Sequence, residues 1–130
     1  MNRMRKVLIA DDEVKVGQLV KRLIQWDRLG LTCIGLVTDG QTAYEKILSE
    51  SPDIVITDIR MPVLTGLEMI QKASEQGVKC HFIVVSGYKY FDYAQKALKY
   101  GVEDYLLKPI DEDKPVSYTH LRAHETEADL

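Results

Sequence analysis

The chain has 130 residues, a formal net charge of −3, and a composition that is 45 % hydrophobic and 28 % charged. This length predicts one globular domain, and the composition excludes a disordered or fibrous chain. The acidic balance argues against a protein whose main task is to coat nucleic acid. The apolar runs are about four residues long, whereas a membrane span needs about 20, and no apolar signal-peptide region follows the N-terminus. We therefore expect a cytoplasmic protein without a membrane partner.

Short apolar runs alternate along the chain with longer segments of helical periodicity. The runs predict strands at residues 6–10, 32–37, 54–58, 81–86 and 104–107. All but the second are almost continuously apolar, which is typical of strands covered on both faces. Apolar residues three and four positions apart predict helices within residues 16–24, 43–48, 67–73 and 91–98. The cysteines, Cys33 and Cys80, lie in apolar segments without metal-ligand spacing, so we expect buried, reduced thiols.

Turn residues agree with this division of the chain. Asp39-Gly40 and Ser51-Pro52 bracket the second predicted helix, and Gly77 ends the third. Alternating strands and helices with short connections predict an α/β fold, in which helices cover both faces of a parallel sheet. The pattern stops after Asp113, where Pro115 and a segment without apolar periodicity replace the expected fifth helix. The sequence therefore predicts a domain over residues 4–113 and an atypical tail over residues 114–130.

Polar side chains stand at the carboxyl ends of the predicted strands, the edge where open α/β sheets bind ligands. They are Asp11, Asp12 and Glu13 after the first strand, Asp58 at the end of the third, Ser86 at the end of the fourth, and Lys108 after the fifth. Singly, each has an ordinary explanation as a helix cap, a turn residue or a solvated charge. Helix caps do not explain why all of them occur at one edge.

The residue types of the expected cluster are explained if it binds both a cation and an anion. Two carboxylates about 4 Å apart repel each other by roughly 4 kcal/mol at an effective dielectric constant of 20. Mg²⁺, which prefers oxygen ligands, would relieve that repulsion. A lysine and a hydroxyl beside such an ion suit a phosphoryl group. Asp58 is the candidate nucleophile, because it stands alone at the end of an apolar strand.

These residues resemble the receiver domains of two-component response regulators. The resemblance covers residues 4–113 and is carried by Ala10-Asp11-Asp12-Glu13, Thr57-Asp58-Ile59-Arg60-Met61-Pro62, Gly66, Val85-Ser86-Gly87 and Asp104-Tyr105-Leu106-Leu107-Lys108-Pro109. It implies a doubly wound five-stranded sheet in the order 2-1-3-4-5. It also implies that a sensor histidine kinase phosphorylates the chain, which then acts as a slowly self-dephosphorylating signalling switch and not as an enzyme.

The resemblance assigns a role to each residue of the cluster. Asp58 would accept the phosphoryl group, while Asp11, Asp12, Asp58 and the backbone carbonyl of Arg60 would bind Mg²⁺. Ser86 and Lys108 would contact the phosphoryl oxygens, Ser86 and Tyr105 would form the conformational switch, and Lys108-Pro109 would be a cis peptide.

Two further segments carry weaker resemblances. Residues 86–94 resemble receivers that precede an AraC-type DNA-binding domain, so we expect a transcriptional output domain outside this chain and DNA contact only through it. Five tyrosines lie between Tyr88 and Tyr105. Because tyrosine is enriched at interfaces, we expect a receiver homodimer through the face around Tyr90 to Tyr105. Residues 116–126 resemble a translated sequencing adapter. We therefore expect that the gene is truncated near Asp113 or Lys114, that the following residues are an assembly artefact, and that the fifth helix is missing or replaced.

Two other functions fit parts of the pattern. An aspartyl-phosphate hydrolase would place a second acid two residues after its nucleophile, whereas the better nucleophile here is on the third strand. A nucleotide-binding domain would have a glycine-rich loop after the first strand, where this chain has acids.

Overall fold

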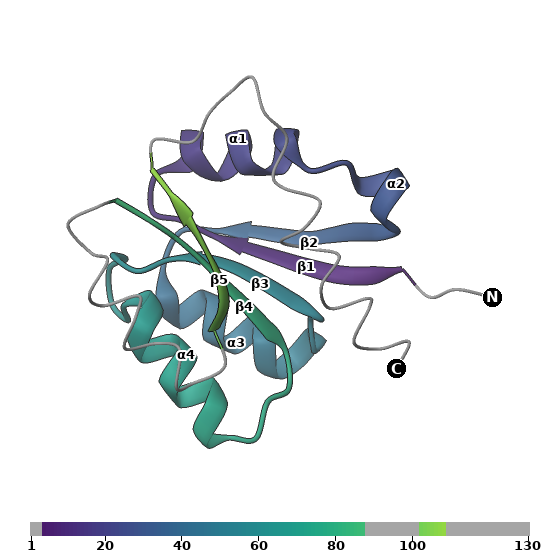
Figure 1. Cartoon of the computed structure of the whole chain (residues 1–130). Coiled ribbons are helices and arrows are strands. Elements are labelled where there is room, and N and C mark those ends of the chain that lie inside the picture. Colours follow the sequence, from purple (N-terminus) through teal and green to yellow (C-terminus); the bar gives the residue numbers. More distant parts are fainter. Residues whose placement is uncertain (1–3, 88–101, 109–130) are drawn as a thin grey trace.

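The structure, a computed structural model, describes residues 4–87 and 102–108 (Figure 1). Their strands form one parallel sheet in the order β2-β1-β3-β4-β5. The strands are β1 (Arg5–Ala10), β2 (Leu31–Val37), β3 (Ile54–Asp58), β4 (His81–Ser86) and β5 (Val102–Leu107). The predicted α/β fold and strand order are confirmed, and the bounds of β3 and β4 are those predicted from the sequence.

Helices cover both faces of this sheet (Figure 1). On one face lie α1 (Val14–Leu23) and α2 (Trp26–Leu29), and on the other lie α3 (Gly40–Glu50) and α4 (Gly66–Glu75). Helix α2 was not predicted from the sequence, because its four residues are too few to show helical periodicity. The helix predicted within residues 91–98, the fifth helix and the tail lie outside the described residues. None of the helices within the described ranges has the length and apolar character needed to cross a membrane.

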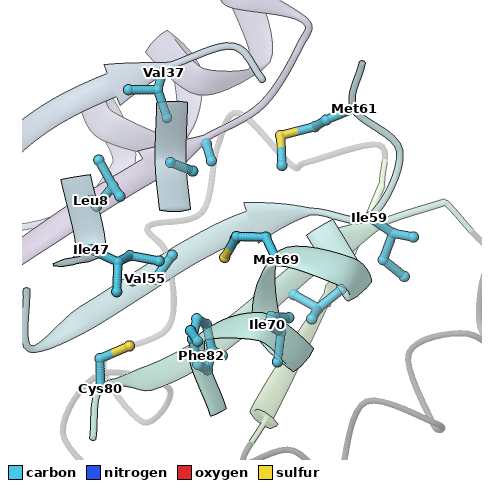
Figure 2. Packing of buried hydrophobic residues seen from close by; sticks show 14 residues of the cluster. Leu8, Val37, Ile47, Val55, Ile59, Met61, Met69, Ile70, Cys80 and Phe82 are labelled. Atoms are coloured by element: carbon cyan, nitrogen blue, oxygen red, sulfur yellow. The ribbon is translucent and has the colours of Figure 1, made fainter. Parts of the chain in front are cut away.

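Alternation of side chains along each strand divides the core into two layers. In the layer beneath α3 and α4, Leu8, Val55 and Phe82 of the strands pack against Ile47 and Met69 of the helices (Figure 2). The other layer lies beneath α1 and α2, and its buried members are Val7, Ile9, Val20, Ile24, Leu31, Ile54, Ile56, Ile83 and Val85. The strands that carry the residues of the carboxyl edge are therefore packed on both faces.

The two cysteines are both free thiols, as predicted. Cys80 is buried, and this burial raises the pKa of its thiol to about 12, which makes it an inert core residue. The predicted burial is wrong for Cys33, which is only half-buried because it lies on the edge strand β2.

Two N-caps fix the starts of α3 and α4. Asp39 accepts a hydrogen bond from the backbone N–H of Thr42 at 2.7 Å, and this bond lowers the pKa of Asp39 below its usual value. Thr65 and Glu68 form a capping box at the start of α4. These caps fix two of the helices that begin at the carboxyl edge of the sheet.

Candidate functional site

Side chains from β1, β3 and β5 meet at the carboxyl edge of the sheet. Lys108, directly after β5, places its Nζ 2.9 Å from Asp58 Oδ2 and 3.2 Å from Asp11 Oδ2. The same Nζ lies 3.3 Å from Glu13 Oε1. Asp58 ends β3 and Asp11 follows β1. The structure therefore brings the lysine together with acids from two other strand ends.

Four carboxylates form the acidic part of this site. Each of them offers one carboxylate oxygen, and these four oxygens all lie within 4.8 Å of one another. The residues are Asp11, Asp12, Glu13 and Asp58. Asp11 and Asp58 are buried, whereas Asp12 and Glu13 are exposed. A set of oxygen donors, half of it open to water, fits a hard divalent cation that keeps part of its hydration shell, as Mg²⁺ does. The residues present therefore fit the predicted Mg²⁺ site.

The carboxylate of Asp58 is oriented by the loop that follows it. Its Oδ1 accepts hydrogen bonds from the backbone N–H groups of Ile59 at 2.7 Å and Arg60 at 3.4 Å. Its Oδ2 faces Lys108. The loop itself is closed by the N–H of Gly66, which donates to the carbonyl of Ile59 at 2.7 Å. Asp58 is thus held from both sides in one orientation.

Residue 66 is a glycine for a steric reason that the sequence motif alone did not reveal. A Cβ at this position would lie 1.9 Å from the backbone carbonyl oxygen of Asp58. No side-chain rotation relieves that contact, because the atom it meets belongs to the backbone. The start of α4 can pack directly beneath Asp58 only because residue 66 is a glycine.

The electrostatics of the site are unbalanced. Burial, together with the negative charge of Asp58, raises the pKa of Asp11 to about 6. The hydrogen bond from the N–H of Glu13 and the ammonium of Lys108 act in the opposite direction and lower this pKa. Burial alone would lower the pKa of Lys108, but hydrogen bonds and charges from Asp58 and Asp11 outweigh it and raise that pKa. One ammonium thus faces four carboxylates, so the site attracts further positive charge.

Ser86 ends β4 beside the lysine. The residue is fully buried, and its backbone carbonyl accepts a hydrogen bond from the N–H of Lys108 at 2.8 Å. Its hydroxyl lies 3.4 Å from the carbonyl oxygen of Gly87 as a hydrogen-bond donor. The strand ends that carry Ser86 and Lys108 are therefore tied directly to each other.

Some features predicted from the sequence lie outside the residues that the structure describes. Tyr105 pairs in register with Val84, but its side chain lies outside the described residues. The Lys108-Pro109 peptide and the tyrosines from Tyr88 to Tyr100 also lie outside them. The described contact of Arg60 is its N–H with Asp58, so metal binding by its carbonyl stays a prediction.

Glu13 belongs to the acidic run after the first predicted strand, but no function was predicted for it from the sequence. The structure shows that it is one of three acids in contact with Lys108. Its partner is 95 residues away along the chain, so local sequence could not identify the pair.

Comparison with known proteins identifies the family. The profile of the response regulator receiver domain matches residues 7–119. The chain belongs to this family. Its members are signalling domains that histidine kinases phosphorylate, they use Mg²⁺ at an acidic pocket, and they are not enzymes in the classical sense.

Several curated relatives are named as transcriptional regulatory proteins. The chain is 46 % identical over 114 residues to the transcriptional regulatory protein YesN of Bacillus subtilis, covering 88 % of this chain and 31 % of that protein. It is 36 % identical over 108 residues to the transcriptional regulatory protein HptR of Staphylococcus aureus, covering 83 % of this chain and 42 % of that one. The chain therefore spans less than half of the length of these relatives, 31 % of one and 42 % of the other.

Solved receiver domains share the fold. The receiver domain of the response regulator AraT from Geobacillus stearothermophilus is 35 % identical, with a TM-score of 0.80, and the match covers 95 % of this chain and 92 % of that one. The receiver domain of a LuxO-type repressor from Vibrio parahaemolyticus is 23 % identical, with a TM-score of 0.81 and coverage of 98 % and 96 %. The second likeness concerns the fold alone.

Proposed function

We propose that Asp58 accepts a phosphoryl group from a phosphohistidine of a sensor histidine kinase. The observation that carries this proposal is the geometry around its carboxylate. Two backbone N–H groups hold Oδ1, while Oδ2 lies 2.9 Å from the ammonium of Lys108. A buried nucleophile that is already oriented beside a cation suits phosphoryl transfer, where catalysis is mostly positioning and charge stabilisation.

The transfer exchanges one bond to phosphorus for another. A carboxylate oxygen of Asp58 forms the new P–O bond as the P–N bond to the kinase imidazole breaks, and the electron pair of that bond stays on the imidazole nitrogen. Lys108 stabilises the charge on the phosphoryl oxygens, and the hydroxyl of Ser86 donates a hydrogen bond to one of them afterwards. Slow attack by water returns the free carboxylate and inorganic phosphate.

Mg²⁺ would be held by Asp11, Asp12, Asp58 and the backbone carbonyl of Arg60. The ion supplies positive charge that a single lysine cannot provide to so many acids. The support for this assignment is the donor set itself, which is all oxygen and partly exposed.

The phosphorylated site would then bias the conformation of the neighbouring strands. Ser86 and Tyr105 would be the switch residues, because Ser86 lies in the site and both residues belong to paired strands. The receiver, over residues 4–113, would dimerise through the face around Tyr90 to Tyr105 and control a transcriptional output domain that contacts DNA. The names of YesN and HptR support transcription as the output.

The decisive experiment measures adduct formation with beryllofluoride and Mg²⁺ by ¹⁹F NMR. We expect a bound signal with the wild type and with the control Asp27→Asn, whose carboxyl lies outside the acidic cluster. We expect complete loss of that signal with Asp58→Asn. Intact-mass measurement after acetyl phosphate treatment should show one phosphoryl group under the same pattern. An unaltered adduct in Asp58→Asn would contradict the proposal, and rapid turnover of small phosphomonoesters would favour the hydrolase.

A further inference from the structure

Glu13 occupies a position where local stability favours a different residue. It is the N-cap of α1, yet its side chain caps no backbone N–H of that helix. Serine, threonine, aspartate and asparagine are preferred at an N-cap because their short side chains can reach the free N–H groups. The longer side chain of Glu13 instead reaches across to Lys108, with its Oε1 3.3 Å from Nζ.

The three carboxylates that contact Lys108 are not equivalent. The side chains of Asp58 and Asp11 are only 7 % and 4 % exposed, whereas that of Glu13 is 64 % exposed. The two buried acids are fixed by backbone N–H groups as well. Glu13 is held only by its pair with the lysine among the contacts described for its carboxylate. Of the three, its carboxylate can therefore leave Lys108 at the least cost.

We propose that Glu13 is a positioning residue that acts through Lys108 and competes with the phosphoryl group for its ammonium. This inference rests on the proposed function, because it assumes phosphorylation of Asp58. A phosphoryl group carries between one and two negative charges and needs hydrogen-bond donors on its oxygens. Lys108 has a single positive charge, and three acids already share it. The contact with Glu13 therefore stabilises the unphosphorylated site and is given up when the phosphoryl group binds.

This competition has a measurable size. An exposed ion pair contributes about 0.2–1 kcal/mol, which corresponds to a change of up to about fivefold in an equilibrium constant. Removal of the pair should therefore raise the affinity of the site for beryllofluoride by up to about fivefold. The rate of phosphorylation by acetyl phosphate should rise in the same direction. Both measurements are made at saturating Mg²⁺, so that a change in metal affinity does not enter.

Two substitutions separate the contact with Lys108 from charge alone. Glu13→Gln removes the negative charge and the ion pair. Glu13→Asp keeps the charge at the mouth of the site, but its shorter side chain withdraws from Lys108 and can cap α1. The matched control is Glu45→Gln, which removes the same charge from the exposed surface of α3. If Glu13 acts through Lys108, both substitutions at position 13 raise the affinity and the control does not.

Thermal unfolding distinguishes this role from a structural one. Because aspartate is a better N-cap than glutamine, Glu13→Asp should have a higher melting temperature than Glu13→Gln. Their affinities for beryllofluoride should nevertheless shift in the same direction from the wild type. An affinity that instead follows the melting temperature would overturn the proposal.

Two further outcomes would also overturn it. An affinity of Glu13→Gln equal to that of Glu45→Gln would show that the pair with Lys108 does not oppose binding. An affinity of Glu13→Asp equal to that of the wild type would show that only charge at the mouth of the site matters. Absence of any adduct with the wild-type protein would instead contradict the proposed function itself, so the two failures are distinguishable.

Discussion

The two edges of the sheet place their carboxylates in opposite kinds of surroundings. At the amino edge, Lys6 N–H donates to Asp53 Oδ2 at 2.8 Å, and the N–H groups of Asp53 and His81 donate to the carbonyls of Lys6 and Asp53, each at 2.9 Å. Every one of these groups has a partner, so Asp53 ties β1, β3 and β4 together. At the carboxyl edge, four carboxylates surround one lysine. The amino edge thus contributes stability, whereas the carboxyl edge keeps unbalanced charge for a ligand.

The largest expected effect concerns the rigid support beneath the carboxyl edge. Gly66→Ala places a methyl group where the carbonyl oxygen of Asp58 lies, since the new Cβ would be 1.9 Å away. We expect a loss of about 3 kcal/mol or more in the free energy of unfolding, because backbone atoms must shift. Urea denaturation measures it. Gly77→Ala is the control, since its Cβ would meet nothing within 4 Å and only its φ of +78° opposes the change. A loss for Gly66→Ala no larger than for this control would contradict the steric explanation.

The next effect concerns the amino edge. Asp53→Ala removes the acceptor of the Lys6 N–H, which we expect to cost about 1–3 kcal/mol of unfolding free energy. The exposed Asp27→Ala should cost much less, because that residue has no such link between strands. Chemical denaturation of both variants tests the claim that the amino edge is built for stability, and equal losses would refute it.

At the carboxyl edge, we expect a substitution to increase the free energy of unfolding, by a smaller amount. Asp11 is buried beside Asp58, and its pKa of about 6 means that it is charged at pH 7.5 at a cost to the folded state. Asp11→Asn should therefore raise the free energy of unfolding by about 1 kcal/mol at that pH in the presence of a chelator. Added Mg²⁺ should stabilise the wild type but not this variant, which denaturation at increasing Mg²⁺ will show. Destabilisation by Asp11→Asn would remove the distinction between the two edges.

The smallest effect comes from an acid at the carboxyl edge that has its own partner. Hydrogen bonds from Thr42 lower the pKa of Asp39, so the folded state favours its ionised form. Its contribution is present above the unfolded pKa of about 3.9 and is lost as the pH falls through the lower folded value. Asp39→Ala should cost at most about 1 kcal/mol at pH 7, and less as the medium is acidified below pH 4. Unfolding curves at pH 7, 5 and 3 measure this difference, which would stay constant if the carboxylate had no special role.

Sequence patterns predicted the sheet more completely than the contacts within the site. The buried strands β3 and β4 have the predicted bounds, because continuous apolar runs define both their ends. The convergence of Asp11, Asp58 and Lys108 followed from a general property of parallel sheets. The link between Glu13 and Lys108 could not be predicted, since it depends on side-chain reach across the folded edge. A glutamate at an N-cap position was the one available signal.

The position of β5 has a consequence for how the fold is completed. Lys108 follows a strand that is paired only with β4 among the described strands, and β4 is in turn paired with β3. A slip of β5 by one residue would move the lysine by about 3.3 Å and reverse the faces of its neighbours. The buried acids would then lose their cation. The contacts of Lys108 with Asp11 and Asp58 therefore require this register of β5, so the alignment of the sheet edge and the charge balance of the site depend on each other.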